Sequence, residues 1–245
     1  MKIKKIILSR GRSSTICTHN VLKDFDLVVP TSEVDKYKTV VHNANEIVEI
    51  PDSIKGLGAV RNWVLDYYKD EILVMFDDDI DCFFSLLNIK AFKITDVDMI
   101  DLIIDNCASN CLEAGASMFS FNQVQGDIRK YDHTQPFNLK TWTGTIVGII
   151  GRKYKFTEIN KTKVDADYSL QCLLKDRIVW VDNRFSFGCK RDNNVGGNSL
   201  YRNQDSVNKE IQFLKDKWGK HIKITERENK YSLKLNIDRT QKIII

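Results

Sequence analysis

The chain has 245 residues, of which 42% are apolar. It contains 3 prolines and 12 glycines and carries a net charge of +4. This composition excludes a disordered, collagen-like or linker-rich protein and allows one or two domains. The charge is unevenly distributed along the chain. Residues 1–183 hold 23 basic and 26 acidic side chains, whereas residues 184–245 hold 14 basic and 7 acidic ones. The excess of basic side chains in the last quarter indicates either a polyanionic partner or a solvated lysine-rich face.

The first part of the chain alternates between predicted strands and helices. Short apolar runs predict four strands, over residues 5–8, 26–30, 46–50 and 72–76. Helices are expected between them, over residues 15–22, 33–38 and 59–69. The apolar face of the last helix is expected to hold Val60, Trp63, Val64 and Tyr67. This alternation predicts a parallel α/β sheet, whose ligands bind at the carboxyl ends of the strands.

The second part of the chain is less regular. Helices are predicted over residues 95–114, 165–174 and 206–218, and strands over residues 117–121, 144–151 and 178–181. Residues 123–141 are polar and aromatic, and we expect them to face a ligand. Residues 185–199 are predicted to be irregular. From Ile222 onwards the chain is expected to form strands or an extension.

Three adjacent aspartates, Asp77, Asp78 and Asp79, follow the apolar run at residues 72–76. Their charges repel one another, so a folded chain keeps them together where something compensates, and a hard divalent cation is the natural partner. In an extended chain Asp77 and Asp79 point the same way and Asp78 the opposite way, which suits one carboxylate on a metal and another on a hydroxyl. A solvated turn or a helix N-terminus is the alternative interpretation.

Basic side chains are expected close to these aspartates. Arg10 and Arg12 follow the first predicted strand and are suited to phosphate, with help from Ser13, unless they are ordinary surface charges. Arg61 lies in the first turn of a predicted helix, where a cation is unfavourable for the helix dipole. We therefore expect Arg61 to reach an anion, or to extend into solvent.

Further polar candidates lie in the second part of the chain. Asp165 and Asp167 begin a predicted helix, where they either stabilise its N-terminus or include a general base for a hydroxyl acceptor. Residues 188–203 combine glycines, amides and cations, which suits either phosphate contacts or a surface loop. His133 is expected to touch a substrate or to be a surface residue.

The order of these motifs resembles that of a known enzyme class. It runs from a Ser-Arg-Gly-Arg loop through Val-Pro-Thr-Ser-Glu and Gly-Leu-Gly-Ala-Val-Arg-Asn to an apolar strand and Asp-Asp-Asp. This order is similar to the nucleotide-sugar-binding half of GT-A glycosyltransferases. It looks most like the phage TET-associated glycosyltransferases, which modify hydroxymethylated pyrimidines in DNA. The resemblance is specific over residues 3–82 and weaker over residues 140–203.

The resemblance implies a GT-A (Rossmann-like) α/β fold, with a mixed, mainly parallel sheet flanked by helices. It implies a GT-A domain over residues 1–203, of which residues 1–90 bind the nucleotide sugar and residues 91–203 the acceptor. A basic C-terminal helix or extension would follow over residues 204–245. The donor would be a nucleotide sugar, with a UDP-sugar favoured.

The resemblance also implies roles for individual residues. Asp79 and Asp77 would bind Mn²⁺ or Mg²⁺, with Asp77 or Asp78 near the ribose. The residues around the nucleotide would be Ser9, Arg10, Arg12, Glu33 and Arg61. Asp167 is favoured over Asp165 as the acid that activates the acceptor. Many GT-A enzymes complete the metal site with a downstream histidine, which residues 184–203 lack, so Asp192, Asn193 or water is expected to substitute.

A DNA acceptor would give the basic last quarter a function, because phosphate contacts position a nucleic acid. Candidates for these contacts are Lys190, Arg191, Arg202, Lys209, Lys215 and Lys217. His133 and Trp142 are candidates for contacting a base that is flipped out of the helix.

Other functions stay open from the sequence. They are a glycosyltransferase acting on a polysaccharide or glycoprotein, a nucleotidyltransferase, and a non-catalytic module that binds a nucleotide or a nucleic acid. No segment approaches the roughly 18 consecutive apolar residues of a membrane helix, and no signal peptide is expected. We therefore expect no membrane partner. The six cysteines are scattered and form no C-x-x-C pair, which indicates reduced thiols and a cytoplasmic protein, located in the host cytoplasm if a phage encodes it.

Overall fold

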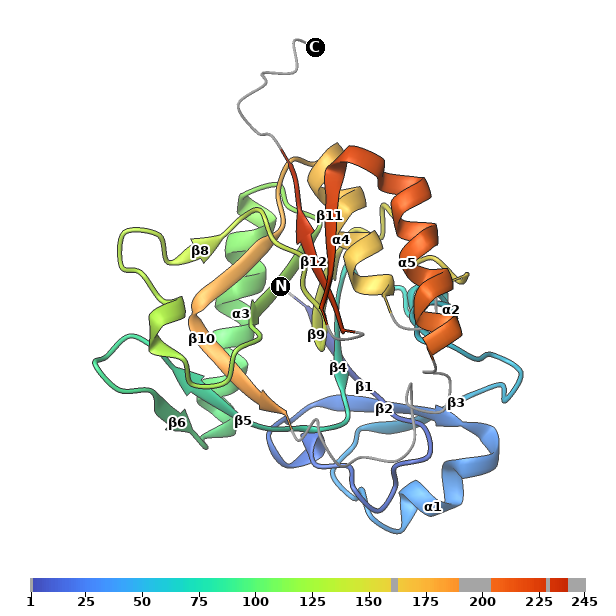
Figure 1. Ribbon diagram of the computed structural model, residues 1–245. Helices are drawn as coiled ribbons and strands as arrows, with labels where there is room; N and C mark the ends of the chain where they lie inside the picture. Colours follow the sequence, from blue (N-terminus) through green and yellow to red (C-terminus); the bar gives the residue numbers. More distant parts are fainter. Residues whose placement is uncertain (1, 160–162, 190–203, 228–229, 238–245) are drawn as a thin grey trace.

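A mixed sheet forms the centre of the computed structural model, which describes residues 2–159, 163–189, 204–227 and 230–237. Its first strands are β1 (Ile3–Leu8), β2 (Phe25–Pro30), β3 (Glu46–Ile50) and β4 (Ile72–Asp77). They are parallel and lie in the order β3-β2-β1-β4 (Figure 1). The predicted parallel α/β half is therefore confirmed.

The sheet continues with strands of both directions. β9 (Ile146–Ile150) is antiparallel to β4, and β7 (Met118–Asn122) is antiparallel to β9, so β7 runs in the direction of β4. β10 (Trp180–Cys189) is parallel to β7. The sheet is completed by β5 (Ile80–Ser85), β6 (Phe92–Ile94) and β8 (Phe137–Asn138). The mixed, mainly parallel α/β sheet expected from the resemblance is confirmed.

Two predictions for this half were wrong. No strand was predicted for β5, and residues 185–199 were predicted to be irregular, whereas residues 185–189 belong to β10. β5 and β10 form an antiparallel pair in which Phe187 lies opposite Phe83, and both phenylalanines are buried. Because each strand is stabilised by a partner about a hundred residues away, the local sequence pattern does not reveal either one. The rest of the expected irregular segment, from residue 190, lies outside the described residues.

Helices cover both faces of the sheet. α1 (Val34–Lys38) and α3 (Val97–Glu113) pack on one face, where they share an apolar core with side chains of β2, β4 and β7. α2 (Leu57–Tyr67) and α4 (Val164–Lys175) pack on the other face, in a second apolar core. The molecule is therefore a helix–sheet–helix sandwich.

The apolar face of α2 is confirmed for Val60, Trp63 and Val64, which pack in the second core, but not for Tyr67, which is 47% exposed. The helix also buries Arg61 and Leu65, which were not predicted. The reason is polar: the Asn62 side chain exchanges two hydrogen bonds of 2.8 and 2.9 Å with the backbone of Phe156. These contacts, together with the ion pairs of Arg61, fix the rotation of the helix about its axis.

The helix expected over residues 15–22 was also predicted wrongly. Only Thr18–Asn20 forms a helical turn, of the 3-10 type. The Thr18 hydroxyl donates to the carbonyl of Asp77 (2.7 Å) and accepts from the amide of Ile80 (2.9 Å). A side chain that bonds to the end of β4 and the start of β5 in this way replaces the hydrogen bonds of a longer helix.

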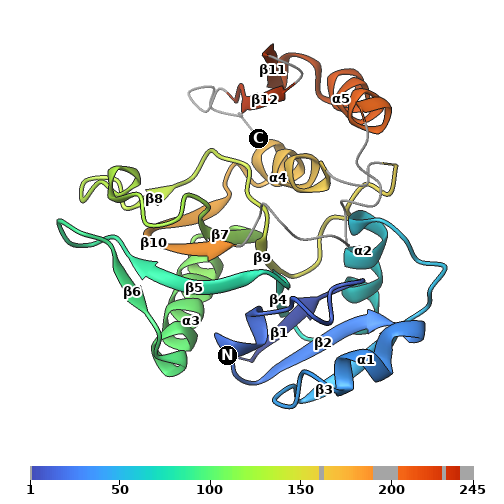
Figure 2. The same cartoon turned by 60° about the horizontal axis from the view of Figure 1, so that its bottom comes forward.

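The C-terminal segment adds a further layer on top of α4 (Figure 2). It consists of α5 (Gln204–Trp218) and a hairpin of β11 (Ile222–Arg227) and β12 (Lys230–Leu235). A small apolar cluster joins it to α4 through Leu170, Leu214 and Ile222. No helix in the described part of the chain is long and apolar enough to cross a membrane.

Candidate active site

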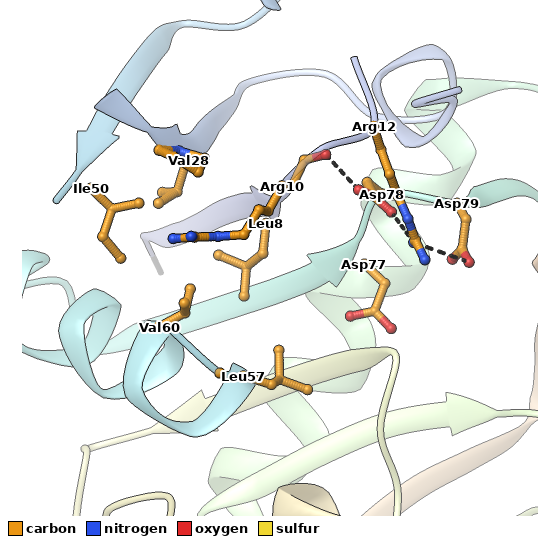
Figure 3. Close-up of a pocket in the computed structure, with 13 residues that line it drawn as sticks. Leu8, Arg10, Arg12, Val28, Ile50, Leu57, Val60, Asp77, Asp78 and Asp79 are labelled. Atoms are coloured by element: carbon orange, nitrogen blue, oxygen red, sulfur yellow. Dashed lines mark hydrogen bonds and ion pairs between the residues drawn. The ribbon is translucent and has the colours of Figure 1, made fainter. Parts of the chain in front are cut away.

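A pocket of about 220 Å³ opens at the carboxyl ends of β1, β2 and β4 (Figure 3). One side is polar and is formed by the segments that follow β1 and β4. The opposite wall is apolar, with side chains from β2, β3 and α2. The residues that line it are Leu8, Ser9, Arg10, Arg12, Val28, Pro30, Ile50, Gly56, Leu57, Val60 and Asp77, Asp78 and Asp79. The loops predicted to converge therefore meet at one site.

Asp78 is held by the loop that follows β1. Its carboxylate accepts a hydrogen bond of 2.5 Å from the Ser9 hydroxyl and one of 2.7 Å from the Arg12 guanidinium. The same guanidinium nitrogen lies 3.8 Å from the Asp79 carboxylate. Asp78 is thus directed toward Ser9 and Arg12 (Figure 3), and these contacts fix the turn that carries the three aspartates.

The loop after β1 is itself tied to its neighbours. Gly11 has a φ of 68°, which favours glycine, and its amide donates to Glu33 at 2.6 Å. The Tyr37 hydroxyl accepts from the Arg12 amide at 3.1 Å and lies 2.6 Å from the Ser9 hydroxyl. Burial raises the pKa of Tyr37 to about 12, so this hydroxyl keeps its proton at neutral pH. Arg10 lines the pocket and donates to the carbonyl of Ile54 at 2.7 Å.

Arg61 lies behind the pocket and does not line it. Its guanidinium is fully buried, donates to the Asp165 carboxylate and lies 3.7 Å from the Asp77 carboxylate. Its flat face packs over the Phe156 ring, at 5.3 Å from the ring centre. Arg61 therefore reaches anions, as the sequence indicated, but these anions are two carboxylates of the same chain. It connects the aspartate turn to the first turn of α4.

The electrostatics of Asp77 suit an exchange between a proton and a cation. Burial raises its pKa to about 7, Arg61 opposes the rise, and the neighbouring Asp79 and Asp165 add to it. A carboxylate that is crowded by others and partly withdrawn from water binds a proton near neutral pH, and a hard cation can take the place of that proton.

The donor atoms present fit a divalent cation such as Mn²⁺ or Mg²⁺. Asp77 and Asp79 offer carboxylate oxygens at the rim of the pocket. Within the described ranges, no group of three or more His, Cys, Asp or Glu side chains is arranged to hold a metal. Two carboxylates suffice where phosphate oxygens and water complete the coordination, as is usual for Mg²⁺. Asp192 and Asn193, considered as further ligands, lie outside the described residues.

The two candidate bases have different surroundings. Asp165 is paired with Arg61 and lies against Gly144, where an added Cβ would be 2.7 Å from its Oδ2 atom. Asp167 is completely buried and its carboxylate receives Lys217 at 2.7 Å, Trp218 at 2.8 Å and Gln171 at 3.0 Å. Of the two, Asp165 lies with the aspartate turn, whereas Asp167 fastens α5 to α4.

The residues expected to bind the acceptor are dispersed. The His133 side chain is 85% exposed, next to Asp132. Trp142 lines a second pocket and donates to the carbonyl of Leu233 at 3.4 Å. Lys190, Arg191 and Arg202 lie outside the described residues.

Three features of the site were not found from the sequence. They are the Tyr37 hydroxyl, the close approach of Gly144 to Asp165, and the contact of Trp218 with Asp167. Each one depends on two segments that are distant in sequence, so no local pattern signals it.

Comparison with known proteins identifies the family. A family model described as TET-Associated Glycosyltransferase matches residues 3–197. The chain therefore belongs to this family. None of the curated proteins matches the sequence.

Solved structures with similar folds are remote in sequence. S. aureus TarS 1-349 in complex with UDP-GlcNAc is 13% identical, with 87% of this chain and 67% of that chain covered and a TM-score of 0.53. Glucosyl-3-phosphoglycerate synthase from Mycobacterium tuberculosis, in complex with Mn²⁺, UDP and glucosyl-3-phosphoglycerate, is 11% identical, with coverages of 96% and 86% and a TM-score of 0.51. In the match to TarS 1-349 without UDP-GlcNAc, the chain spans only 60% of that protein. The likenesses to the UDP-GlcNAc complex of TarS and to the synthase show the fold, which is that of GT-A glycosyltransferases.

Proposed function

We propose that this TET-associated glycosyltransferase transfers a sugar from a nucleotide sugar to the hydroxyl of a hydroxymethylpyrimidine in DNA, with the help of Mn²⁺ or Mg²⁺. The observation that carries the proposal is the pocket at the end of β4, where Asp77 and Asp79 stand at the rim and Asp165 is held behind them by Arg61. The UDP complexes of TarS and of glucosyl-3-phosphoglycerate synthase favour a UDP-sugar as the donor.

The pocket suits a nucleoside diphosphate. Val28, Ile50 and Val60 offer an apolar surface for the base and ribose, and the Arg10 guanidinium extends toward Val28 and Ile50 (Figure 3). Arg12 places positive charge at the polar end, beside the aspartates. Ser9 and Glu33 act indirectly, since they hold Asp78 and the loop that carries the arginines.

Asp77 and Asp79 are the residues that would hold the divalent cation, and Asp78 keeps their turn in place. The bound cation acts as a Lewis acid and neutralises the charge that develops on the departing diphosphate.

Asp165 is the base that we assign for activation of the acceptor. Its side chain is 14% exposed, whereas that of Asp167 is fully buried beneath Lys217. As the acceptor oxygen attacks the anomeric carbon and the bond to the diphosphate breaks, Asp165 takes the hydroxyl proton. Arg61 positions Asp165 and Asp77 relative to each other by pairing with both of them.

DNA binding is assigned to the C-terminal quarter, residues 184–245, because of its excess of basic side chains. Lys190, Arg191 and Arg202 are the proposed phosphate contacts. Lys217 is left out of this set, since it pairs with the buried Asp167 at 2.7 Å. The proposed division is a GT-A domain over residues 1–203 followed by a basic extension over residues 204–245. The proposed location is the cytoplasm, which is that of the host if a phage encodes the protein.

A donor panel tests the assignment. The protein is incubated with UDP- and GDP-sugars and Mn²⁺, and released nucleotide is measured with hydroxymethylated DNA, unmodified DNA or an oligosaccharide acceptor. We expect metal-dependent release from a UDP-sugar, stimulated by the hydroxymethylated DNA alone. Asp79→Ala should abolish release, whereas Asp35→Ala, which removes an exposed carboxylate on α1, should not. No metal-dependent release from any donor would overturn the proposal, and stimulation by the oligosaccharide alone would overturn the DNA acceptor.

A further inference from the structure

A second pocket lies at the same edge of the sheet as Asp77, beyond β9. β9 separates β4 from β7, and the amide of Asp77 donates to the carbonyl of Thr145, just before β9, at 2.9 Å. β7 pairs with β9 through Phe119 and Gly148, and continuing this register places Asn122 level with Thr145. Neighbouring strands are about 4.8 Å apart, so Asn122 lies about 10 Å from Asp77 across the sheet.

The loop that precedes β9 connects this pocket to the proposed base. Trp142 forms part of the pocket wall, and the amide of Thr143 donates to Ser169 of α4 at 3.2 Å. Gly144, the next residue, lies against the Asp165 carboxylate. The two residues of chain from Trp142 to Gly144 span at most about 7 Å, so the pocket wall lies close to Asp165, the proposed catalytic base.

The pocket has a volume of about 330 Å³ and is lined by three kinds of functional group. Asn122, Gln123 and Asn183 contribute amides, and Trp142 contributes an aromatic ring. Two exposed cations also line it: Lys130, and Arg129, whose guanidinium pairs with Asp127 at 2.8 and 3.1 Å. Amides match the hydrogen-bonding edge of a pyrimidine, a tryptophan ring stacks on a base, and cations bind the neighbouring phosphates.

The amides are arranged so that a ligand can take over their bonds. Asn122 accepts from the amide of Val124 at 2.9 Å, which fixes its orientation. Its amide nitrogen then meets the Asn183 side-chain oxygen at 3.4 Å, and the Gln123 amide nitrogen meets the carbonyl of Trp142 at 3.5 Å. Both of these bonds are long, so they hold the side chains in place without strongly competing with a ligand.

We infer that this pocket receives the acceptor pyrimidine after it is extruded from its strand, and presents its substituent to Asp165 across Gly144. The inference rests on the proposed glycosyl transfer and specifies where the acceptor binds. The donor pocket and the acceptor pocket then lie on opposite sides of Asp77 and Asp165, which is the arrangement that a direct transfer between two substrates requires. The positive charge of Lys130 favours a nucleic acid over a neutral glycan.

Binding of an oligonucleotide tests the inference without relying on the sugar. A labelled single strand with one hydroxymethylcytosine is titrated against the protein in UDP and Mn²⁺. Trp142→Ala should weaken binding about tenfold, the size of a lost base–aromatic stack, whereas Trp142→Phe should restore most of it. Lys130→Ala should lower the slope of log Kd against log salt by about 0.7, whereas Lys36→Ala, which removes an exposed lysine on α1, should not.

Photocrosslinking gives an independent readout for variants that fold poorly. A strand with 5-iodouridine at the modified position should crosslink to the wild-type protein at Trp142 or another residue of this pocket. Crosslinks confined to other regions, or unchanged binding in both Trp142→Ala and Lys130→Ala, would overturn the inference. Binding of an oligosaccharide instead of the strand, lost in Trp142→Ala, would overturn the nucleic-acid assignment. Wild-type protein that binds the strand at this pocket but transfers no sugar would contradict the proposed function alone.

Discussion

Arg61 and Asp165 form an ion pair across 104 residues of sequence, with the guanidinium completely buried. The second amino group of Arg61 lies 3.7 Å from Asp77, so one cation joins the aspartate turn of the first half to α4 of the second. Because the proposed metal ligand and the proposed base are held by the same side chain, their spacing does not depend on a flexible loop. This relationship underlies the first predictions.

Replacement of Arg61 by methionine should destabilise the protein by about 3 kcal/mol, because it leaves Asp165 without its buried partner. Urea denaturation at neutral pH measures the change. Lys155→Met is the control, since Lys155 and its partner Asp66 are both largely exposed and the loss should stay below about 1 kcal/mol. Equal losses in the two variants would contradict a structural role for the buried pair.

The two aspartates of α4 should respond differently to removal of charge. Asp165→Asn should lower kcat by about 10³, as expected for loss of a general base, while the folded protein keeps its affinity for UDP. It should also lower the stability of the fold, because the buried Arg61 loses its partner. Asp167→Asn should mainly destabilise the fold, because Lys217 loses its buried partner. Steady-state kinetics and urea denaturation of both variants check this assignment. A greater loss of kcat in Asp167→Asn would return the catalytic role to Asp167.

The raised pKa of Asp77 gives the metal-free protein a characteristic pH dependence. Burial, with the charges of Asp79 and Asp165, raises this pKa from 3.8 to about 7. Between these values the folded state holds a proton that the unfolded state has released, so this group's contribution to stability is present at low pH and is lost as the pH rises to 7. Asp77→Asn should remove that decline when unfolding is followed in EDTA at pH 5 and pH 8.

The proton on Asp77 should compete with binding of the metal ion. Below pH 7 a cation must displace it, so Mn²⁺ affinity should weaken by about tenfold for each unit of pH. Calorimetry in buffers of different ionisation heat would detect the released proton. An affinity that is independent of pH between 5 and 7 would show that Asp77 is not a ligand.

Gly144 should be intolerant of a side chain. A Cβ at this position would lie 2.7 Å from the Asp165 carboxylate and would displace it. Gly144→Ala should therefore lower kcat by about 10², the cost of a small misplacement of a reacting group. In the Asp165→Asn background the same substitution should cost much less, since there is no base left to displace. If the two substitutions lowered kcat by fully additive amounts, Gly144 would not act through Asp165.

Trp218 should stabilise the attachment of α5. Its indole nitrogen donates to the buried Asp167 at 2.8 Å, from a segment that lies beyond the family match. Trp218→Phe keeps the ring and removes the donor, so we expect a loss of about 2 kcal/mol in the free energy of unfolding. Trp63→Phe, in which a ring stacked on Tyr67 is replaced by another aromatic ring, is the matched control with a smaller expected loss.

The first half of the fold was predictable from the sequence because its signals are local. Buried parallel strands are continuous apolar runs, and Pro30 and Pro51 mark the ends of two of them. The aspartate turn was recognisable for the same reason, since Asp77 directly follows such a run. The order of motifs then pointed to the family that the comparison identifies.

The rest depended on contacts between distant segments. α2 buries Arg61 because Asp165 compensates its charge, and neither the hydrophobic pattern nor the helix dipole signals a partner 104 residues away. The sequence offered no ground for preferring Asp167 over Asp165 as the acid that activates the acceptor. The two residues stand only two positions apart, so both match the position of that acid equally well. What the sequence does not signal is that Lys217 and Trp218 of α5 contact Asp167, which is the observation behind the proposal of Asp165 as the base.

Analysis of the nucleosides from treated DNA tests the central proposal most directly. DNA containing hydroxymethylcytosine or hydroxymethyluracil is incubated with the protein, a UDP-sugar panel and Mn²⁺, then digested and examined by mass spectrometry. We predict that one glycosyl group is added to the hydroxymethylpyrimidine, that the addition depends on metal, and that it is absent with Asp79→Ala and Asp165→Asn. Unmodified nucleosides with every donor, from protein shown to bind UDP and Mn²⁺, would contradict it.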